Sequence, residues 1–207
     1  MTRAFLTTAF FPPVCYFSVM KNHPQVYIEA CESYQKQSYR TRCHIYATGG
    51  QEVLQVPVCH DNGMSVPISQ VRIDYTSNWI HRHSLAIISA YRSSPFFEYY
   101  WDDISAILNS RPELLMDLNT RLLTLIADNL SLGTEILQTE TFSKEVAGED
   151  FRFSIHPKTK YLTTETSRII ANQTPYYQVF SAKHGFIPNL SILDLLFHEG
   201  PQAAEYL

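Results

Sequence analysis

Residues 3–30, RAFLTTAFFPPVCYFSVMKNHPQVYIEA, give the clearest indication of the fold class. Its first part, RAFLTTA (3–9), is typical of a buried strand, and Pro12-Pro13 then turns the chain. Residues 14–21 have the character of a short helix, and a second strand is expected from Gln25 to Ala30. Strand, helix and strand in succession favour an α/β protein.

A β-hairpin is predicted next along the chain. Thr41 to Ala47 and Glu52 to Val58 flank Gly49-Gly50, which is a strong signal for a two-residue turn. Centring the turn there places an apolar face inward, made of Thr41, Cys43 and Ile45 opposite Val58, Val56 and Leu54. The other face carries Arg40, Arg42, His44 and Tyr46, with Gln55 opposite, and is expected to point outward.

From residue 78 onward the apolar spacing becomes helical. Helices are predicted from Asn78 to Arg92, from Ser94-Pro95, and from Ser110-Arg111-Pro112. Glu135 to Thr139 is expected to return to the sheet, residues 140–173 to form a long polar loop, and Thr174-Pro175 to begin a helix that ends at His184-Gly185. Asn189 is expected to cap the last helix, with Ser191 and Asp194 spaced as a capping box. We therefore expect one α/β domain over residues 1–207, with a mixed sheet built mainly from the N-terminal third and packed by helices from the other two thirds.

Composition narrows the class of protein. The chain has 16 basic and 20 acidic residues and a net charge of −4, which disfavours nucleic acid as a partner because phosphate binding favours a basic surface. No apolar run is long enough to span a membrane, and Pro12-Pro13 interrupts the apolar start, so residues 1–20 are expected to be mature structure in a cytoplasmic protein.

Four cysteines are present, at positions 15, 31, 43 and 59. Two of them precede histidines, as Cys43-His44 and Cys59-His60, which raises the question of a zinc site. In the predicted hairpin Cys43 points inward and His44 outward, and Cys59 lies beyond the pairing. Four free thiols in a reducing compartment are therefore expected, with no metal site.

Polar residues gather in three places, each with a structural alternative. Tyr34, Lys36, Arg40 and Arg42 share one face if the chain is extended there, and their cations suit a carboxylate or a phosphate, although a solvated strand face is the alternative. His83 lies on an apolar helix stripe, either as a general base or as a core histidine. The third group surrounds two helix ends. Its residues are expected either to bind an anion at the start of a helix or only to cap the helix ends. It consists of Gln178, Lys183, His184, Asn189 and Asp194.

The strong catalytic motifs are missing from the sequence. It contains no GxGxxG, GxxxxGK[ST], GxSxG or HExxH pattern, so mononucleotide binding through those particular motifs is excluded. Other modes of binding are not excluded, and the sequence leaves the cofactor unknown.

Read together, several segments resemble the WbqC-like protein family. They are AFFPPVCYFS (9–18), ESYQKQSYRTRCHI (32–45), LQVPV (54–58), NWIHRHSLAIISAYRSSPFFEYY (78–100) and YYQVFSAKHGFIPNLSILDLLFHEG (176–200). The resemblance implies a bacterial protein of surface polysaccharide biosynthesis, since the member that names the family is encoded in an O-antigen cluster, and some relatives are described as glycine or aminoacyl transferases. The family pattern falls on Tyr34, Lys36, Arg40, Arg42, Trp79, His83, Tyr91, Gln178, His184, Asn189 and Asp194.

These observations lead to one mechanistic hypothesis and two alternatives. Under the hypothesis, the anionic group of a nucleotide-linked amino sugar or an activated acyl donor is held by Lys36, Arg40 and Arg42. Tyr34, Trp79 and Tyr91 stack on the sugar or base. His83, oriented by Asp194, removes a proton from the acceptor amine. One alternative is a non-catalytic protein that binds a sugar or a partner. The other is a homodimer that buries an aromatic surface including Phe96-Phe97 and Tyr99-Tyr100.

Overall fold

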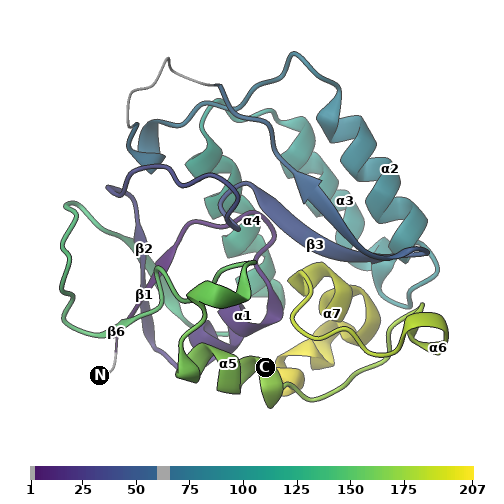
Figure 1. Ribbon diagram of the computed structural model, residues 1–207. Coiled ribbons are helices and arrows are strands. Elements are labelled where there is room, and N and C mark those ends of the chain that lie inside the picture. The colour runs from purple at the N-terminus through teal and green to yellow at the C-terminus, as the bar shows by residue number, and fades with distance from the viewer. Residues whose placement is uncertain (1–2, 60–65) are drawn as a thin grey trace.

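The computed structural model describes residues 3–59 and 66–207 (Figure 1). It begins with strand β1 (Arg3–Thr7), helix α1 (Val14–Lys21) and strand β2 (Gln25–Glu29), as the sequence predicts. Because β1 and β2 pair in parallel, α1 is the crossover between them.

A four-stranded parallel sheet is built around these two strands. Its order is β5-β2-β1-β6, where β5 is Glu135–Gln138 and β6 is Glu149–Asp150. One face carries Ala4, Leu6, Val26 and Ile28, all buried in the same hydrophobic cluster as the apolar side chains of α1. The alternation of buried and partly exposed residues along β1 and β2 therefore reflects a sheet with one face in the core.

The hairpin forms a separate antiparallel sheet of β3 (Arg42–Ala47) and β4 (Gly50–Gln55). The α/β class is thus confirmed, with the strands divided between two sheets. The register differs from the prediction by two residues, since Cys43 pairs with Leu54 rather than Val56. A shift of two leaves every side chain on its predicted face, so Cys43, Ile45 and Leu54 are buried as expected.

Tyr46 is an exception on the face predicted to point outward. It is buried, and its hydroxyl donates to the Gly185 carbonyl at 2.7 Å. Its ring also contacts those of Phe180 and His184. The C-terminal part of the chain therefore covers this end of the hairpin, which no local pattern in the hairpin sequence could indicate.

The main helices are α2 (Trp79–Tyr91), α3 (Phe97–Asn109), α4 (Leu115–Asn129) and α7 (Ile192–Glu199), and the short 3₁₀ segments are η1 (Ile68–Gln70), η2 (Thr159–Tyr161) and η3 (Gly200–Tyr206). The predicted inward stripe of α2 is confirmed, because Trp79, Ile80, His83, Ile87 and Tyr91 are all buried. Figure 1 shows the parallel sheet at one side of the molecule, α2 and α3 at the other, and α4 between them, and β3 contacts both α2 and α7.

Residues 140–185 depart most from the predicted elements. The segment expected to be a loop contains β6, η2 and helix α5 (Thr164–Ala171). The helix expected from Thr174-Pro175 is reduced to α6 (Ser181–His184). The physical reason is that Tyr176 and Gln178 turn into the core, where both donate hydrogen bonds to the Asp194 carboxylate.

The last helix is capped differently from the prediction. Ser191 is the N-cap of α7, and its hydroxyl accepts from the Leu193 N–H at 3.3 Å. Asn189 instead caps another helix, because its Oδ1 accepts from the backbone N–H of Cys15 in the first turn of α1 at 3.0 Å. Asp194 accepts from side chains of the preceding segment and does not close the predicted capping box.

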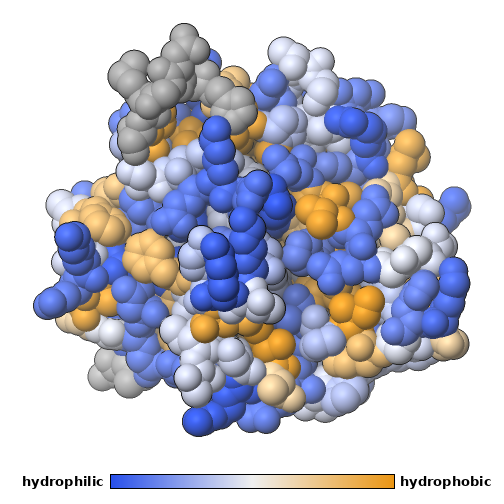
Figure 2. Space-filling view, in the orientation of Figure 1, coloured by the Kyte–Doolittle hydropathy of each residue, from blue (hydrophilic) through white to orange (hydrophobic). Residues whose placement is uncertain are grey.

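Three further observations bear on the protein class. No helix among residues 3–59 and 66–207 is both long and apolar enough to cross a membrane. On the face drawn in Figure 2, apolar residues are scattered among hydrophilic ones. Cys15, Cys31, Cys43 and Cys59 are free thiols, and His60 of the second Cys-His pair lies outside the described residues.

Candidate functional site

The topology of the parallel sheet points to one edge of the molecule. The chain passes from β1 through β2 to β5 in one direction and then returns to place β6 on the other side of β1. In open α/β sheets, ligands bind outside the carboxyl ends of the strands at such a switch in direction. The switch lies between β1 and β6, and the loop after β2 meets the segment after β1 where the Phe10 N–H donates to the Tyr39 carbonyl at 2.9 Å.

Two buried ion pairs hold the segments that leave β2 and β6. Arg40 donates to the Glu32 carboxylate through Nε at 2.8 Å and Nη2 at 2.5 Å, and neither side chain is more than 3% exposed. Arg152, after β6, donates to Glu29 at 2.7 Å and to Asp150 at 2.8 Å. Burial raises the pKa of Glu32, and the facing Arg40 opposes that rise. Because Arg40 is already paired, the cation available to a ligand in this region is a different one.

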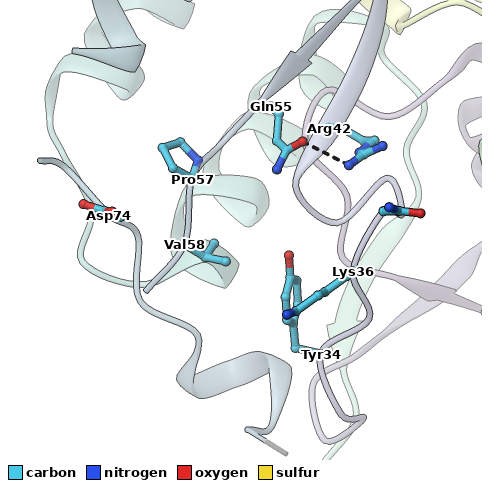
Figure 3. A pocket seen from close by; sticks show the side chains of 8 residues that line it. Tyr34, Lys36, Arg42, Gln55, Pro57, Val58 and Asp74 are labelled. Carbon is cyan, nitrogen blue, oxygen red and sulfur yellow. Dashed lines mark hydrogen bonds between the residues drawn. The ribbon is translucent and has the colours of Figure 1, made fainter. Parts of the chain in front are cut away.

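A pocket of about 490 Å³ opens beside these ion pairs (Figure 3). It lies between the loop after β2, the open end of the hairpin and the segment around residue 74. Its lining residues are Tyr34, Lys36, Gln37, Arg42, Gln55, Pro57, Val58 and Asp74. Figure 3 shows Tyr34 and Lys36 on one side, Arg42 and Gln55 above them, and Asp74 across the opening. The pocket thus has cations on one wall and Asp74 on the other, where its Oδ1 accepts a hydrogen bond from the Thr76 N–H at 2.8 Å.

Backbone contacts fix the walls of this pocket. The Tyr34 N–H donates to the Val66 carbonyl at 3.0 Å, which ties the loop after β2 to the segment before η1. On the opposite wall, the Asp74 N–H donates to the Pro57 carbonyl at 2.9 Å. An extended chain is the condition for Tyr34, Lys36, Arg40 and Arg42 to share one face, and the loop is not extended, because Gln37 has a φ of 59°. That turn sends Arg40 to Glu32 and leaves Arg42 in the pocket.

Arg42 is the best-placed anion-binding group of the pocket. Its Nη2 donates to Gln55 Oε1 at 3.0 Å, across the first pair of the hairpin. Its Nε is buried and has no hydrogen-bond partner within residues 3–59 and 66–207. The bond from Nη2 to Gln55 holds the guanidinium at the pocket wall, and a guanidinium can donate two parallel hydrogen bonds to a planar or tetrahedral oxyanion.

The segment after β6 adds groups that the sequence analysis missed. Lys158 Nζ donates to Gln37 Oε1 at 2.5 Å, so this segment reaches the pocket wall. Burial, followed by the charges of Arg40, Lys158 and Arg42, lowers the pKa of His156 to about 4. The signal available in the sequence is the tripeptide His156-Pro157-Lys158, placed shortly after a strand end in a segment that was predicted to be only a loop.

His83 lies outside this pocket. It is 8% exposed, and its ring lies 5.2 Å from that of Trp79 and 6.1 Å from that of Phe10. Burial, with a smaller contribution from Arg82, lowers its pKa to about 4. Its Nδ1 is buried with no hydrogen-bond partner in the described chain, and the ring lies on the buried stripe of α2.

Asp194, Tyr91 and Gln178 form a separate cluster in the core. Asp194 is fully buried, and its Oδ2 accepts from Tyr176 at 2.7 Å and from Gln178 at 2.8 Å. The Tyr91 hydroxyl accepts from the Tyr46 N–H at 2.9 Å. Burial raises the pKa of Asp194, and the charge of His198 and the hydrogen bonds to the carboxylate oppose that rise. No hydrogen bond or ion pair joins Asp194 to His83 in the part of the chain that the structure describes.

Among the remaining predicted site residues, His184 contacts the hairpin and Asn189 contacts α1. His184 Nε2 lies 3.1 Å from the Thr48 carbonyl, and Lys183 donates to the same oxygen at 3.2 Å. Asn189 caps α1, and Trp79 is buried. The structure therefore brings together Tyr34, Lys36 and Arg42, and it places the other predicted residues elsewhere.

The arrangement has a definite chemical character. The pocket can bind an anion through Lys36 and Arg42, offer the Tyr34 ring and hydroxyl to a sugar, and present a carboxylate across the opening. Within residues 3–59 and 66–207, no three His, Cys, Asp or Glu side chains gather closely enough to hold a metal ion.

The aromatic pairs considered for a dimer surface are mostly internal. Phe97 and Tyr100 are buried on α3, Phe96 is half-buried, and Tyr99 is 75% exposed.

Comparison with known proteins gives one result that bears on identity. No curated protein and no solved structure matches the chain. The model of the WbqC-like protein family matches residues 8–173, which include every residue lining the pocket as well as His83. Gln178, His184, Asn189 and Asp194 lie outside the matched range. The match extends over most of the sequence, and the chain belongs to the WbqC-like protein family.

Proposed function

We propose that this protein binds a nucleotide-linked amino sugar in the Arg42 pocket and transfers an acyl or aminoacyl group to its amine. The step would belong to bacterial surface polysaccharide biosynthesis, with the protein in the cytoplasm. The observation that carries the proposal is the pocket itself, in which Lys36, Arg42 and Tyr34 converge from a loop and a strand.

Charge and size support an anionic small molecule as the ligand. The chain as a whole carries a net charge of −4, yet Lys36 and Arg42 line one wall and Lys158 contacts it. A cationic site in an acidic protein favours an anion through local contacts rather than through the overall field. The volume of about 490 Å³ falls within the range of small-molecule pockets, roughly 300–1,000 Å³.

The opposite wall supports an amine on the same ligand. Asp74 lines the pocket across from Lys36 and Arg42 in Figure 3. A ligand with phosphate at one end and an amino sugar at the other would match both walls. In the reaction, the amine nitrogen forms a bond to the acyl carbon, the bond from that carbon to its leaving group breaks, and a base takes the amine proton. Asp74 is the acidic residue among those lining the pocket, and we assign it to the amine.

A non-catalytic binding protein is the second candidate. The specific observation in its favour is that neither His83 nor Asp194 lines the pocket. Both are buried, His83 against Trp79 and Asp194 in a hydrogen bond with Tyr176. The same pocket would then hold a sugar nucleotide without converting it.

Thermal melting with product analysis tests the proposal. The purified protein is melted with nucleotide sugars, coenzyme A thioesters, ATP and glycine, and each incubation is analysed by mass spectrometry. A ligand at about 100 times its dissociation constant adds roughly 2.7 kcal/mol, which raises the melting temperature by a few degrees. A shift together with a new product mass supports the transferase, and a shift alone supports the binding protein. If no anionic ligand of the panel raises the melting temperature, both the transferase and the binding protein are overturned.

A further inference from the structure

We propose that His156 and Lys158 form a second phosphate subsite beside the Arg42 pocket, so that the ligand carries two linked phosphate groups. This inference rests on the proposed function and narrows its ligand to a diphosphate. The inference rests on the position of the segment after β6. Strands β2 and β6 flank β1 on its two sides, so this segment and the loop that bears Tyr34 reach the pocket from opposite sides of β1.

The first argument is the contact that joins the two segments. Lys158 Nζ donates to Gln37 Oε1 at 2.5 Å, although the two residues are 121 positions apart. Gln37 lines the pocket, and Lys158 is exposed. An ammonium group has three donors, and the one used here fixes its place while leaving others for an oxyanion. Lys158 therefore lies at the edge of the pocket, where its ammonium group contacts the lining residue Gln37.

The second argument is the hydrogen bonding of His156. Its Nδ1 lies 3.0 Å from the backbone N–H of Lys158, which can only donate. Nδ1 is therefore the acceptor, and the neutral ring carries its proton on Nε2. A neutral imidazole held in this way presents one N–H donor, which suits a phosphate oxygen without requiring the ring to be charged.

The third argument is the balance of charge around this segment. The charges that act most on His156 belong to Arg40, Lys158 and Arg42, all of them cations. Arg40 is neutralised by Glu32, at the 2.5 Å contact already described. Among residues 3–59 and 66–207 the ion pairs include neither Arg42 nor Lys158, so both of these cations remain available to an anion. Two cations on adjoining segments, neither of them paired with a carboxylate, favour an anion that is bound by both.

The experiment compares ligands that differ by one phosphate. Calorimetric titration of the full chain measures binding of uridine diphosphate against uridine monophosphate, and of pyrophosphate against phosphate. The second pair repeats the comparison without a nucleoside. The wild-type protein is expected to bind the two-phosphate member of each pair at least tenfold more tightly, and Lys158→Gln and His156→Gln are expected to remove most of that preference.

Two controls make the result decisive. Lys160→Gln changes an exposed cation on the same segment, whose Nζ lies over the Tyr161 ring, and should leave both affinities unchanged. Arg42→Gln should weaken every ligand alike, because its subsite is common to them. Lys158 is exposed, so its variant is expected to fold even if the His156 variant is destabilised.

The outcomes separate this inference from the proposed function. Equal affinity of the wild-type protein for both members of each pair would overturn the second subsite and leave the sugar-nucleotide site standing. The same would follow if Lys158→Gln weakened both members equally. Failure of any nucleotide or phosphate to bind would overturn both proposals.

Discussion

Arg152 donates to Glu29 through Nη1 at 2.7 Å, joining two fully buried side chains that lie 123 residues apart. Glu29 ends β2 and also accepts from the Cys31 N–H, while Arg152 follows β6 and also bonds to Asp150. The pair therefore fixes the positions of the two segments that reach the candidate site, one from each side of β1.

Replacing Arg152 by Met is expected to destabilise the protein strongly. The change leaves the Glu29 carboxylate buried without its counter-ion, and breaking a buried pair in this way costs about 3–5 kcal/mol. Urea denaturation measures the loss. The exposed pair of Arg72 and Glu113 provides the matched control, and Arg72→Met should cost less than about 1 kcal/mol.

The double variant Glu29→Gln with Arg152→Met separates pairing from packing. If the charge left behind causes the loss, neutralising Glu29 should recover part of it. Equal instability of the double and single variants would show instead that the lost hydrogen bonds and packing of Arg152 dominate.

Arg42→Gln is expected to weaken binding of an anionic ligand by about tenfold to a hundredfold, the range that follows from losing a charge-assisted hydrogen bond of roughly 1.5–3 kcal/mol. Stability should change little, because the side chain is partly exposed and its hydrogen bond to Gln55 is at the surface. Titration with a nucleoside diphosphate measures the effect. Arg121→Gln, on the exposed side of α4, should leave the affinity as it is, and a comparable loss there would mean that the binding is nonspecific.

Local patterns were sufficient to predict the framework. The strand-helix-strand start, the α2 stripe and the inward face of the hairpin all follow from apolar periodicity. The hairpin face was predicted correctly even though the register was shifted by two residues, because a period-two pattern is unchanged by such a shift.

Long-range contacts explain what could not be predicted. Arg40 and Arg42 are both even-numbered, so an extended chain would place them on one face. The chain instead turns at Gln37, and Arg40 forms an ion pair with Glu32 that the sequence does not reveal. Likewise, the spacing of Asp194 fits a capping box. Its carboxylate instead accepts hydrogen bonds from Tyr176 and Gln178, which belong to a segment predicted to be helical. His156 and Lys158 were overlooked because their place beside the pocket depends on β6, a strand of two residues.

Asp194→Asn is expected to destabilise the protein without altering ligand binding in the Arg42 pocket. The carboxylate accepts hydrogen bonds from Tyr176 and Gln178, and an amide NH₂ in its place would face those donors, at a cost of roughly 1–3 kcal/mol. Asp103→Asn, on the exposed face of α3, is the control for loss of one negative charge. Lost affinity in a stably folded Asp194 variant would return Asp194 to the binding site.

His83→Phe is expected to flatten the dependence of stability on pH. Burial lowers the pKa of His83 from 6.5 to about 4, with Arg82 as the charge that acts on it. Between these values the unfolded chain binds a proton that the folded chain does not, so the free energy of unfolding falls as the pH is lowered through this window. The stability is fully present above pH 6.5, and the loss by pH 4 is about 3 kcal/mol at most.

Phenylalanine keeps the ring between Phe10 and Trp79 but cannot bind the proton. Unfolding in urea at a series of pH values between 4 and 7 should therefore show a shallower slope for His83→Phe than for the wild type. His81→Phe, on the exposed side of the same helix, should keep the wild-type slope. If His83→Phe instead retained the full slope and lost turnover at unchanged stability, His83 would have to be accessible to substrate, and the role of a general base would be restored to it.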